Sequence, residues 1–512
     1  MFLNLQVGNL IEPLTGRTWD RQKIKQQLYQ RIAYYQSYGM SQSDRVFLHY
    51  GNQIEFFVDI LAIWSLGGCV IPIDSRLTAF EVETLARAAT PRFSLWYGAV
   101  DSSIAASLSS LDVKILETSS SFTEGTVVST PSVPGNLLSL DQAALILFTS
   151  GTTGQPKGVV HTHRSLRARW MALQQNLGLE KYRHTLCLLP THFGHGLICN
   201  CLFPWLFGQD LFIVPPFKPD LIMQLGELLD RYGITFMSSV PSVWRLALKM
   251  AKPPQSKTLE RVFCGSAPLS AFLWQEIQSW TGTKEVWNSY GITETGSWVA
   301  GTTVPDFTPD DGLIGKPWGA EVKILKSAST EAPPFMQEEC ATGESGYIWL
   351  NTPALMQGYF GRDDLTRQVV SQGWFMTGDI GLVDDRGLLY LRGREREEIN
   401  KGGMKVYPGD IDAAIERFEG TADVCSFGYG DDPLYGQNIG VALVMKDTSD
   451  ETIRNLYAWA KQLLAKHQMP IRWYLLESIP RTSRGKVNRV NVAEVCATLT
   501  PLDLRKLLQE NS

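Results

Sequence analysis

The chain has 512 residues, of which 44% are hydrophobic and 19% charged, and its formal net charge is −5. A single hydrophobic core stops growing near roughly 250–300 residues, so this length predicts two or more domains. The composition is that of a globular protein and not of a disordered one. The slightly acidic balance disfavours nucleic acid as a partner, although a local basic patch could still hold a nucleotide.

No targeting or membrane segment is expected. Residues 1–14 lack both a basic start and a long apolar run, so no signal peptide is predicted. The two most apolar stretches, residues 56–73 and 197–217, are interrupted by polar residues, glycines or prolines and indicate core elements. Among the eight cysteines, only Cys199 and Cys201 are close, at a spacing that fits neither a zinc site nor a redox pair. Buried free thiols in a cytoplasmic protein are therefore expected.

Helix and strand patterns alternate from the start of the chain, which predicts a parallel sheet covered by helices. Residues 118–135 are rich in Ser, Thr, Pro and Gly and predict a surface loop. Helices are expected at 21–38, 55–67, 77–89 and 164–177, and strands at 45–49, 69–73, 143–149, 185–189, 211–214, 235–238 and 261–263.

The pattern changes at residue 312. Through residue 392, short strands at 321–324, 346–350 and 388–391 stand between Gly and Pro turns, which predicts a small β-rich subdomain. The last ~115 residues return to mixed α and β character and predict a compact terminal domain.

A glycine-rich loop follows the strand expected at 143–149. It reads Ser150-Gly151-Thr152-Thr153-Gly154-Gln155-Pro156-Lys157-Gly158. Glycines let the backbone approach a polyphosphate, N–H and hydroxyl groups can donate to its oxygens, and a lysine adds charge. The loop is not a Walker loop, because a proline stands five residues after the first glycine. Alone, it fits better a polar turn between a strand and a helix.

Four further motifs follow in order. They are Tyr290-Gly291-Ile292-Thr293-Glu294 after an expected strand, Thr377-Gly378-Asp379, Gly393-Arg394-Glu395-Arg396 with Lys401-Gly402-Gly403, and Pro480-Arg481-Thr482-Ser483-Arg484-Gly485-Lys486. In this order the five segments resemble the adenylate-forming superfamily of acyl- and aryl-CoA synthetases, peptide-synthetase adenylation domains and firefly-type luciferases. The resemblance spans residues 45–489 and is nearest to the acyl-CoA synthetases.

The resemblance implies an ATP site. Tyr290 would stack on adenine, Thr293 would touch the α-phosphate, and Glu294 would hold Mg²⁺. Asp379 would accept the ribose hydroxyls beside Arg394. The phosphate-binding residues would be Thr149, Ser150, Gly151, Thr152, Thr153, Gly154 and Lys157, and Gly265, Ser266, Ala267, Pro268, Asn288, Ser289 and Gly291 would surround the adenine. Read singly, a Tyr is often a core aromatic and a Gly-Asp pair a turn cap.

The resemblance also implies two reactions at one site. Lys486 would bridge the attacking carboxylate and the α-phosphate, where a fixed cation offsets the repulsion of two anions. Arg396 occupies the family's hinge position, although it could be one more charge in a solvated turn. Turning on this hinge would withdraw Lys486 and bring Gly402 and Gly403 to the thiol arm of coenzyme A, or to the phosphopantetheine of a carrier protein.

The segment Pro190-Thr191-His192-Phe193-Gly194-His195-Gly196 resembles the motif that lines the acid pocket, with Ser239 and Val240 nearby. Phe193 would gate the pocket and the thiol tunnel. Relatives that activate α-amino acids usually carry Asp where this chain has Gly194, and an ammonium buried without a partner is costly, so an α-amino acid is disfavoured. His192 and His195 are expected to hydrogen-bond a loop, the alternative being contact with a polar group of the acid.

The implied fold is a large α/β domain, residues 1–395, made of two Rossmann-like subdomains and a β-barrel subdomain. A small mobile α+β domain, residues 396–512, would close over it. The implied activity is ATP-dependent activation of an aryl or aliphatic acid to acyl-AMP and transfer to coenzyme A. The alternative is a ligase that loads a separate carrier protein, since no carrier site follows Lys486. A non-enzymatic nucleotide-binding protein is disfavoured because all the charged motif residues are present, and Asn400 disfavours a light-emitting oxidation.

Overall fold

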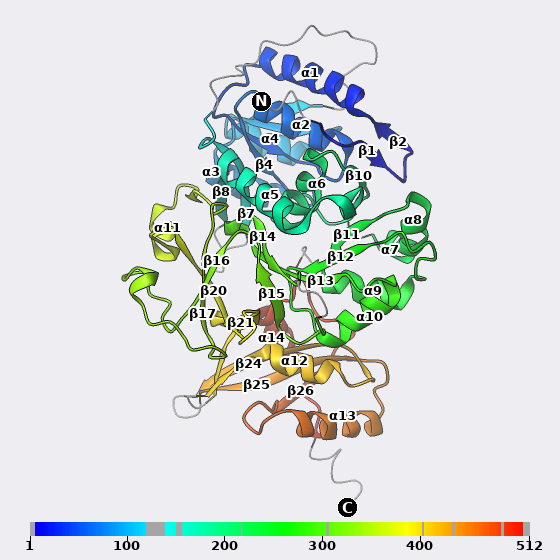
Figure 1. Ribbon diagram of the computed structural model, residues 1–512, viewed down its shortest axis with the longest axis vertical. Coiled ribbons are helices and arrows are strands. Elements are labelled where there is room, and N and C mark those ends of the chain that lie inside the picture. The colour runs from blue at the N-terminus through cyan, green and yellow to red at the C-terminus, as the bar shows by residue number, and fades with distance from the viewer. Residues whose placement is uncertain are drawn as a thin grey trace, which may run out of the picture.

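The large, N-terminal part of the chain is built on two sheets with parallel centres (Figure 1). The computed structural model describes residues 6–118, 139–149, 156–216, 218–303, 307–401, 404–432, 436–482 and 486–504. Most of the loop predicted at 118–135 therefore lies outside the described residues, as do Ser150–Gly154 of the glycine-rich loop and both Gly402 and Gly403.

The first sheet passes from a parallel centre into an antiparallel extension. Strands β1, β10, β9, β11, β12 and β13 lie side by side in that order and pair in parallel. Beyond β13, strands β14, β15, β21, β20, β17 and β16 follow in that order and pair antiparallel. In spatial order the strands are β16 (Glu321–Leu325), β17 (Gly346–Asn351), β20 (Trp374–Val383), β21 (Leu389–Arg394), β15 (Leu313–Pro317), β14 (Ser297–Gly301), β13 (Val286–Ile292), β12 (Arg261–Gly265), β11 (Phe236–Ser239), β9 (His184–Cys187), β10 (Asp210–Ile213), β1 (Leu10–Glu12) and β2 (Arg17–Trp19), with β19 (Val370–Ser371) beside β20.

The second sheet has a parallel centre and an antiparallel edge. Strands β6, β5, β3, β4 and β7 lie side by side in that order and pair in parallel. Strands β8 and β18 continue the sheet beyond β7 and pair antiparallel. In spatial order the strands are β18 (Gly358–Tyr359), β8 (Lys157–Thr162), β7 (Ala143–Thr149), β4 (Cys69–Pro72), β3 (Arg45–Leu48), β5 (Phe93–Trp96) and β6 (Lys114–Glu117).

Helices cover both sheets. Helix α2 is buried on every side, as its almost continuous apolar sequence requires, whereas α3 is amphipathic and begins at a capping box made by Thr78 and Glu81. The helices are α1 (Arg21–Ser37), α2 (Ile54–Ser65), α3 (Ala79–Ala89), α4 (Ser102–Ser110), α5 (His163–Leu177), α6 (Phe203–Leu206), α7 (Pro219–Met223), α8 (Leu225–Tyr232), α9 (Pro241–Met250), α10 (Ala271–Thr281) and α11 (Asp363–Val369). Among the described residues, none of the helices is both long and apolar enough to cross a membrane.

The residues from Ile399 onward form a separate lid, seen at the bottom of Figure 1. Its hydrophobic clusters contain lid residues alone. The lid is a sheet in the order β23-β22-β25-β24 with β26 beside β25, packed with three helices. The elements are β22 (Ile399–Lys401), β23 (Met404–Val406), α12 (Pro408–Glu416), β24 (Thr421–Asp432), β25 (Gly436–Met445), α13 (Asp450–Leu463), β26 (Arg472–Leu475) and α14 (Arg489–Ala497).

The predicted α/β fold class is confirmed, with three local corrections. The glycine-rich loop does not lead from a strand into a helix, because β8 follows it and pairs antiparallel with β7. Tyr290 does not follow a strand but lies inside β13, at a bulge against β14. The resemblance implies that Gly265-Ser266-Ala267-Pro268 is a strand beside the adenine, but β12 ends at Gly265, so the three residues after it form a loop.

Candidate active site

Two of the sequence motifs meet through strand pairing. Asp379 on β20 is the cross-strand neighbour of Arg394 on β21, and their side chains form an ion pair of 2.9 Å. Gly378, with φ of 71°, takes the left-handed conformation that suits glycine and turns the strand just before Asp379. Because Asp379 is only 1% exposed, its carboxylate needs these partners.

Tyr290 completes this group from the neighbouring subdomain. Its hydroxyl donates to the Asp379 carboxylate at 2.5 Å. Burial, and next to it the charge of Asp379, raise the pKa of Tyr290 well above its usual value, so the phenol stays protonated. A Cβ on Gly291 would lie 2.1 Å from the Ser297 carbonyl oxygen, which explains the glycine after this tyrosine. The structure thus joins Tyr290 and Asp379, both buried, with the partly exposed Arg394 in one cluster.

A second cluster stands where β8, β18 and the short helix η4 (Thr293–Thr295) meet. The Tyr359 hydroxyl donates to Glu294 at 2.8 Å, and the Lys157 Nζ lies 5.5 Å from the centre of the Tyr359 ring. The Met356 N–H donates to the Glu294 carbonyl at 2.7 Å and fixes the turn. Tyr359 therefore contacts one carboxylate through its hydroxyl and lies near one lysine with its ring.

His161 lies on β8, the strand after the glycine-rich loop, and connects this strand to the turn that contains Glu294. Its Nε2 donates to the Thr293 carbonyl at 2.8 Å, and its Nδ1 lies 3.3 Å from the Ser165 hydroxyl. Burial lowers the pKa of His161 to about 4, so the ring is neutral at physiological pH. The contact with the Thr293 carbonyl requires Nε2 to carry the proton of this neutral ring.

This burial predicts a pH dependence of stability. The folded-state pKa of His161 lies below the usual value, so the unfolded chain binds the proton first; stability is full above pH ~6.5 and falls as the pH drops toward 4. We expect His161→Gln to lessen that fall by about 1.4 kcal/mol per pH unit. Urea unfolding between pH 7 and pH 5 measures it, with His467→Gln on the lid as the control. An unchanged slope for His161→Gln would contradict the prediction.

The acid-side segment, residues 190–196, ends in a π-helix, His195–Leu202. His195, its first residue, lies between two hydroxyls: Nδ1 is 2.6 Å from Ser266 Oγ and Nε2 is 2.5 Å from Ser238 Oγ. Ser266 has φ of 65°, an uncommon conformation for a residue other than glycine, and directly follows β12. His195 thus bonds a loop residue, as predicted, and also bonds Ser238, which lies on β11.

The other residues of this segment have different surroundings. His192 lies 3.5 Å from the Asp74 carboxylate, measured from Nε2. Phe193 is buried in the same hydrophobic cluster as Val240. A Cβ on Gly194 would contact Leu147 and Ser297 at 3.5 Å and Ile198 at 3.8 Å. A side chain at that position would therefore face mostly apolar groups.

Lys486 reaches this region from the lid. Burial, and next to it the charge of Lys486, lower the pKa of His195 to about 3. Thr482 and Lys486 form the neck of a hairpin: the Thr482 N–H donates to the Lys486 carbonyl at 2.8 Å, and the Lys486 N–H donates to the Thr482 hydroxyl at 3.2 Å. The charge of a lysine at the neck of this hairpin thus acts on a histidine of the acid-side segment.

The model of a family described as "AMP-binding enzyme" matches residues 22–360, more than half of the chain. The chain belongs to this AMP-binding enzyme family. Among curated proteins, it is 32% identical to a 2-succinylbenzoate–CoA ligase of Bacillus licheniformis over 68% of this chain and 70% of that one. It is 27% identical to an oxalate–CoA ligase of Arabidopsis thaliana over 89% of each chain. MatB of Rhodopseudomonas palustris with ATP bound has a similar fold, with a TM-score of 0.81 over 97% of each chain at 23% identity.

The remaining predicted residues of this AMP-binding enzyme surround the two clusters. Asn288 and Ser289 are buried on β13, and the Asn288 amide donates to the Leu313 carbonyl at 2.8 Å. Ser239 is buried at the end of β11, and Thr149 ends β7 with its hydroxyl 3.5 Å from the Lys157 carbonyl. Ala267 and Pro268 lie in the loop after β12, and Arg396, predicted to be the hinge, lies in the one-turn helix η6 (Glu395–Glu397).

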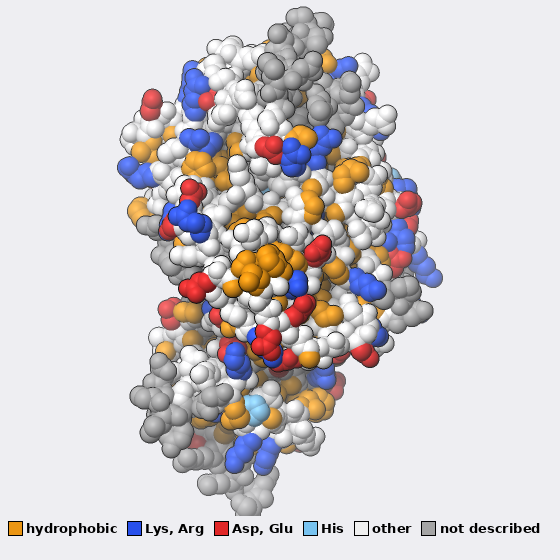
Figure 2. Space-filling model, turned by 60° about the vertical axis from the view of Figure 1, so that its left-hand side comes forward, with side chains coloured by type: hydrophobic (Ala, Val, Ile, Leu, Met, Phe, Trp, Pro, Cys, Tyr) orange, Lys and Arg blue, Asp and Glu red, His pale blue; other side chains and the backbone are white. Residues whose placement is uncertain are grey.

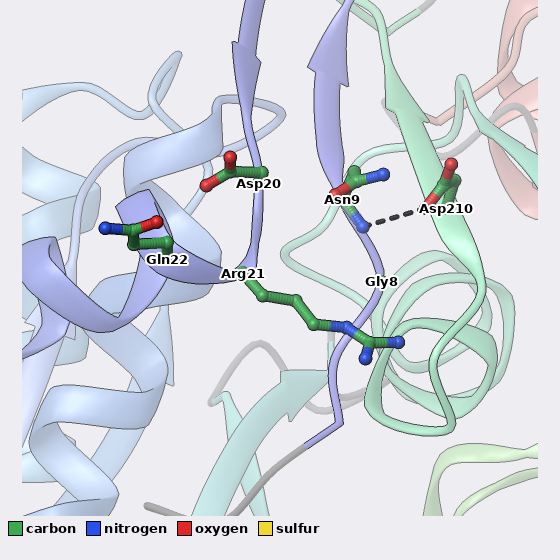
Figure 3. A pocket seen from close by; sticks show the side chains of 6 residues that line it. All are labelled: Gly8, Asn9, Asp20, Arg21, Gln22 and Asp210. Atoms are coloured by element: carbon green, nitrogen blue, oxygen red, sulfur yellow. Dashed lines mark hydrogen bonds between the residues drawn. The ribbon is translucent and has the colours of Figure 1, made fainter.

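The AMP-binding enzyme has site residues that the sequence did not indicate. Tyr359 and His161 contact the motif residues, but neither stands in a motif, and only the pairing of distant strands brings them there. The hollow in Figure 3 does not belong to this site. It has a volume of about 390 Å³ and lies between Arg21, Asn9 and Asp210 near β1 and β10.

Proposed function

We propose that the chain is an AMP-forming ligase that joins a carboxylic acid to coenzyme A. In the first reaction, an acid oxygen attacks the α-phosphorus of ATP, the bond to the β-phosphate oxygen breaks, and pyrophosphate leaves. In the second, a thiol sulfur attacks the acyl carbon, the bond to AMP breaks, and the thiol proton is lost. The observation that carries the proposal is the buried Asp379 carboxylate held by Arg394 and Tyr290.

The residues present fit ATP. The buried carboxylate of Asp379 would accept the ribose hydroxyls, with Arg394 and Tyr290 beside it. Lys157 and the glycine-rich loop would hold the outer phosphates, whose charge grows as pyrophosphate leaves. Lys486 would bring the acid oxygen and the α-phosphate together by interacting with both.

The residues also fit Mg²⁺ held jointly with ATP. Among the described residues, no group of three or more metal-ligating side chains occurs, so the protein would supply few ligands itself. Mg²⁺ in phosphoryl-transfer sites is often bound by one or two carboxylates plus substrate phosphates, and Glu294 stands where it could do this. The ion would neutralise charge on the phosphates, while Tyr359 holds the Glu294 carboxylate in place.

The acid is proposed to be aryl or aliphatic and to lack an α-ammonium group. Leu147 and Ile198 beside Gly194 offer such a group no carboxylate. The curated relatives named above are ligases for 2-succinylbenzoate and oxalate, so acids with a second carboxylate belong in any test beside simple aryl and fatty acids. The free cysteines suit a reducing compartment, and we place the reaction in the cytoplasm.

The test offers the enzyme ATP, Mg²⁺ and a panel of acids, with coenzyme A or a phosphopantetheinylated carrier protein as the thiol. We expect pyrophosphate release with an aryl, aliphatic or dicarboxylic acid, little release with any standard amino acid, and thioester on coenzyme A by mass spectrometry. Strong turnover of an amino acid would contradict the proposed acid class. Thioester on the carrier alone would contradict the proposed acceptor and establish the carrier-loading alternative.

A further inference from the structure

Four charged side chains alternate in sign where the lid meets the large domain. Glu416 at the end of α12 pairs with Arg245 on α9. The Arg245 Nε lies 3.9 Å from Asp423 on β24, and the other Asp423 oxygen lies 2.6 Å from the Arg481 guanidinium. In the space-filling view, side chains of both signs gather at this junction (Figure 2). We call Glu416, Arg245, Asp423 and Arg481 the junction cluster.

Only Arg245 in the junction cluster belongs to the large domain. Its side chain is 22% exposed and the two carboxylates are 11% and 17% exposed, so these charges are largely shielded from solvent. The charges of Glu416 and Arg245 also act on Glu276 of α10, as does that of Lys446 on the lid. Charges shielded in this way need partners, because an unpaired buried charge is costly. Arg245 is therefore the group by which the large domain holds both lid carboxylates.

The junction cluster is connected directly to Lys486. Arg481 pairs with Val487 in an antiparallel bridge, so the residue held by Asp423 stands opposite the residue after Lys486. The hydrogen bonds between Thr482 and Lys486 close the same hairpin. A shift of Asp423 would therefore move the base of the hairpin that carries Lys486.

Arg245 is also close to the acid side of the site. Helix α9 begins directly after Val240, which follows β11, the strand that carries Ser238. One short helix therefore connects the serine bound to His195 with the arginine bound to the lid. This connection lets the position of Lys486 be set relative to the acid-side segment.

We infer that Arg245 is a positioning residue that fixes the Lys486 hairpin for adenylate formation by holding Glu416 and Asp423. The inference rests on the proposed function. A further contact between the lid and the large domain, Arg417 with Asp311, has an arginine 45% exposed, and exposed ion pairs contribute little. When the lid turns for the second reaction, the bonds of Arg245 to the lid must break. Loss of Arg245 should thus affect the first reaction alone.

The test compares Arg245→Met, Arg245→Lys and a control, Arg183→Met, which breaks the Arg183–Glu260 pair within the large domain. One assay measures pyrophosphate release from acid and ATP, and the other thioester formation from a synthetic acyl-adenylate and coenzyme A. We expect Arg245→Met to lower the first kcat up to roughly 100-fold, as for a misplaced group, and to leave the second within twofold. Arg245→Lys should restore part of the first rate, and Arg183→Met should change neither.

A cross-linking measurement tests the docking without any substrate. Asp311→Cys and Arg417→Cys place two thiols at the second contact, and a short bis-maleimide joins them only when the lid is docked as described. We expect Arg245→Met to lower the cross-linking yield severalfold. Equal loss of both half-reactions, or an unchanged yield, would overturn the inference. Absence of pyrophosphate release with every acid in the wild type, together with a lowered yield in the variant, would instead contradict the proposed function.

Discussion

Lys486→Ala should slow formation of the acyl-adenylate by about 10²–10³-fold, the typical cost of losing one fixed group that stabilises a charged transition state. The charge of Lys486 acts on His195 in the described arrangement, whereas the second reaction is proposed to follow rotation of the lid away from it. Transfer from a supplied acyl-adenylate to coenzyme A should therefore stay near the wild-type rate.

The measurement for Lys486→Ala follows both half-reactions separately. Lys466→Ala, a change elsewhere on the lid, is the control and should leave both rates unchanged. If Lys486→Ala also fails to convert the supplied adenylate into thioester, the two reactions do not divide the use of this lysine as proposed.

Arg396→Pro is expected to abolish thioester formation while pyrophosphate release persists. Arg396 lies in the one-turn helix η6, between β21 of the large domain and the first strand of the lid. Proline fixes φ near roughly −65° and is tolerated in the first turn of a helix, so the described arrangement should survive, whereas a rotation that changes φ should be blocked.

The readouts for Arg396→Pro are pyrophosphate release in a single turnover and thioester by mass spectrometry. Arg396→Ala is the matched control, because it removes the charge and leaves the backbone free to rotate. A thioester rate equal in the two variants would show that the backbone at residue 396 does not act as the hinge.

Periodicity and motif order predicted most of what positions the site. The strand expected at 143–149 is β7, and the helix expected at 164–177 is α5 with one more residue at its start. These two predictions are confirmed because a buried strand and an amphipathic helix each have a characteristic pattern of apolar residues, which is visible within a few residues. The chemistry of Asp379 and Arg394 was likewise indicated by adjacent residues in each motif.

What the sequence could not provide depends on long-range pairing. Strand β8 was missed because Val159 and Val160 are both buried, so the segment shows no alternation. Tyr359 reaches Glu294 only because β18 pairs with β8. Arg245 resembles any helical arginine until the lid is placed against α9. In each case the partner lies far along the chain, where local patterns carry no information.

The self-contained core of the lid has a thermodynamic consequence. The lid buries its apolar side chains among themselves, and its contacts with the large domain described above are charge pairs. Changes in heat capacity report mainly the exposure of apolar surface. Rotation of the lid should therefore have a small heat-capacity change. The free-energy difference between its two positions should then change almost linearly with temperature. Ionic strength, which weakens charge pairs, should shift the populations of the two positions more than moderate warming does.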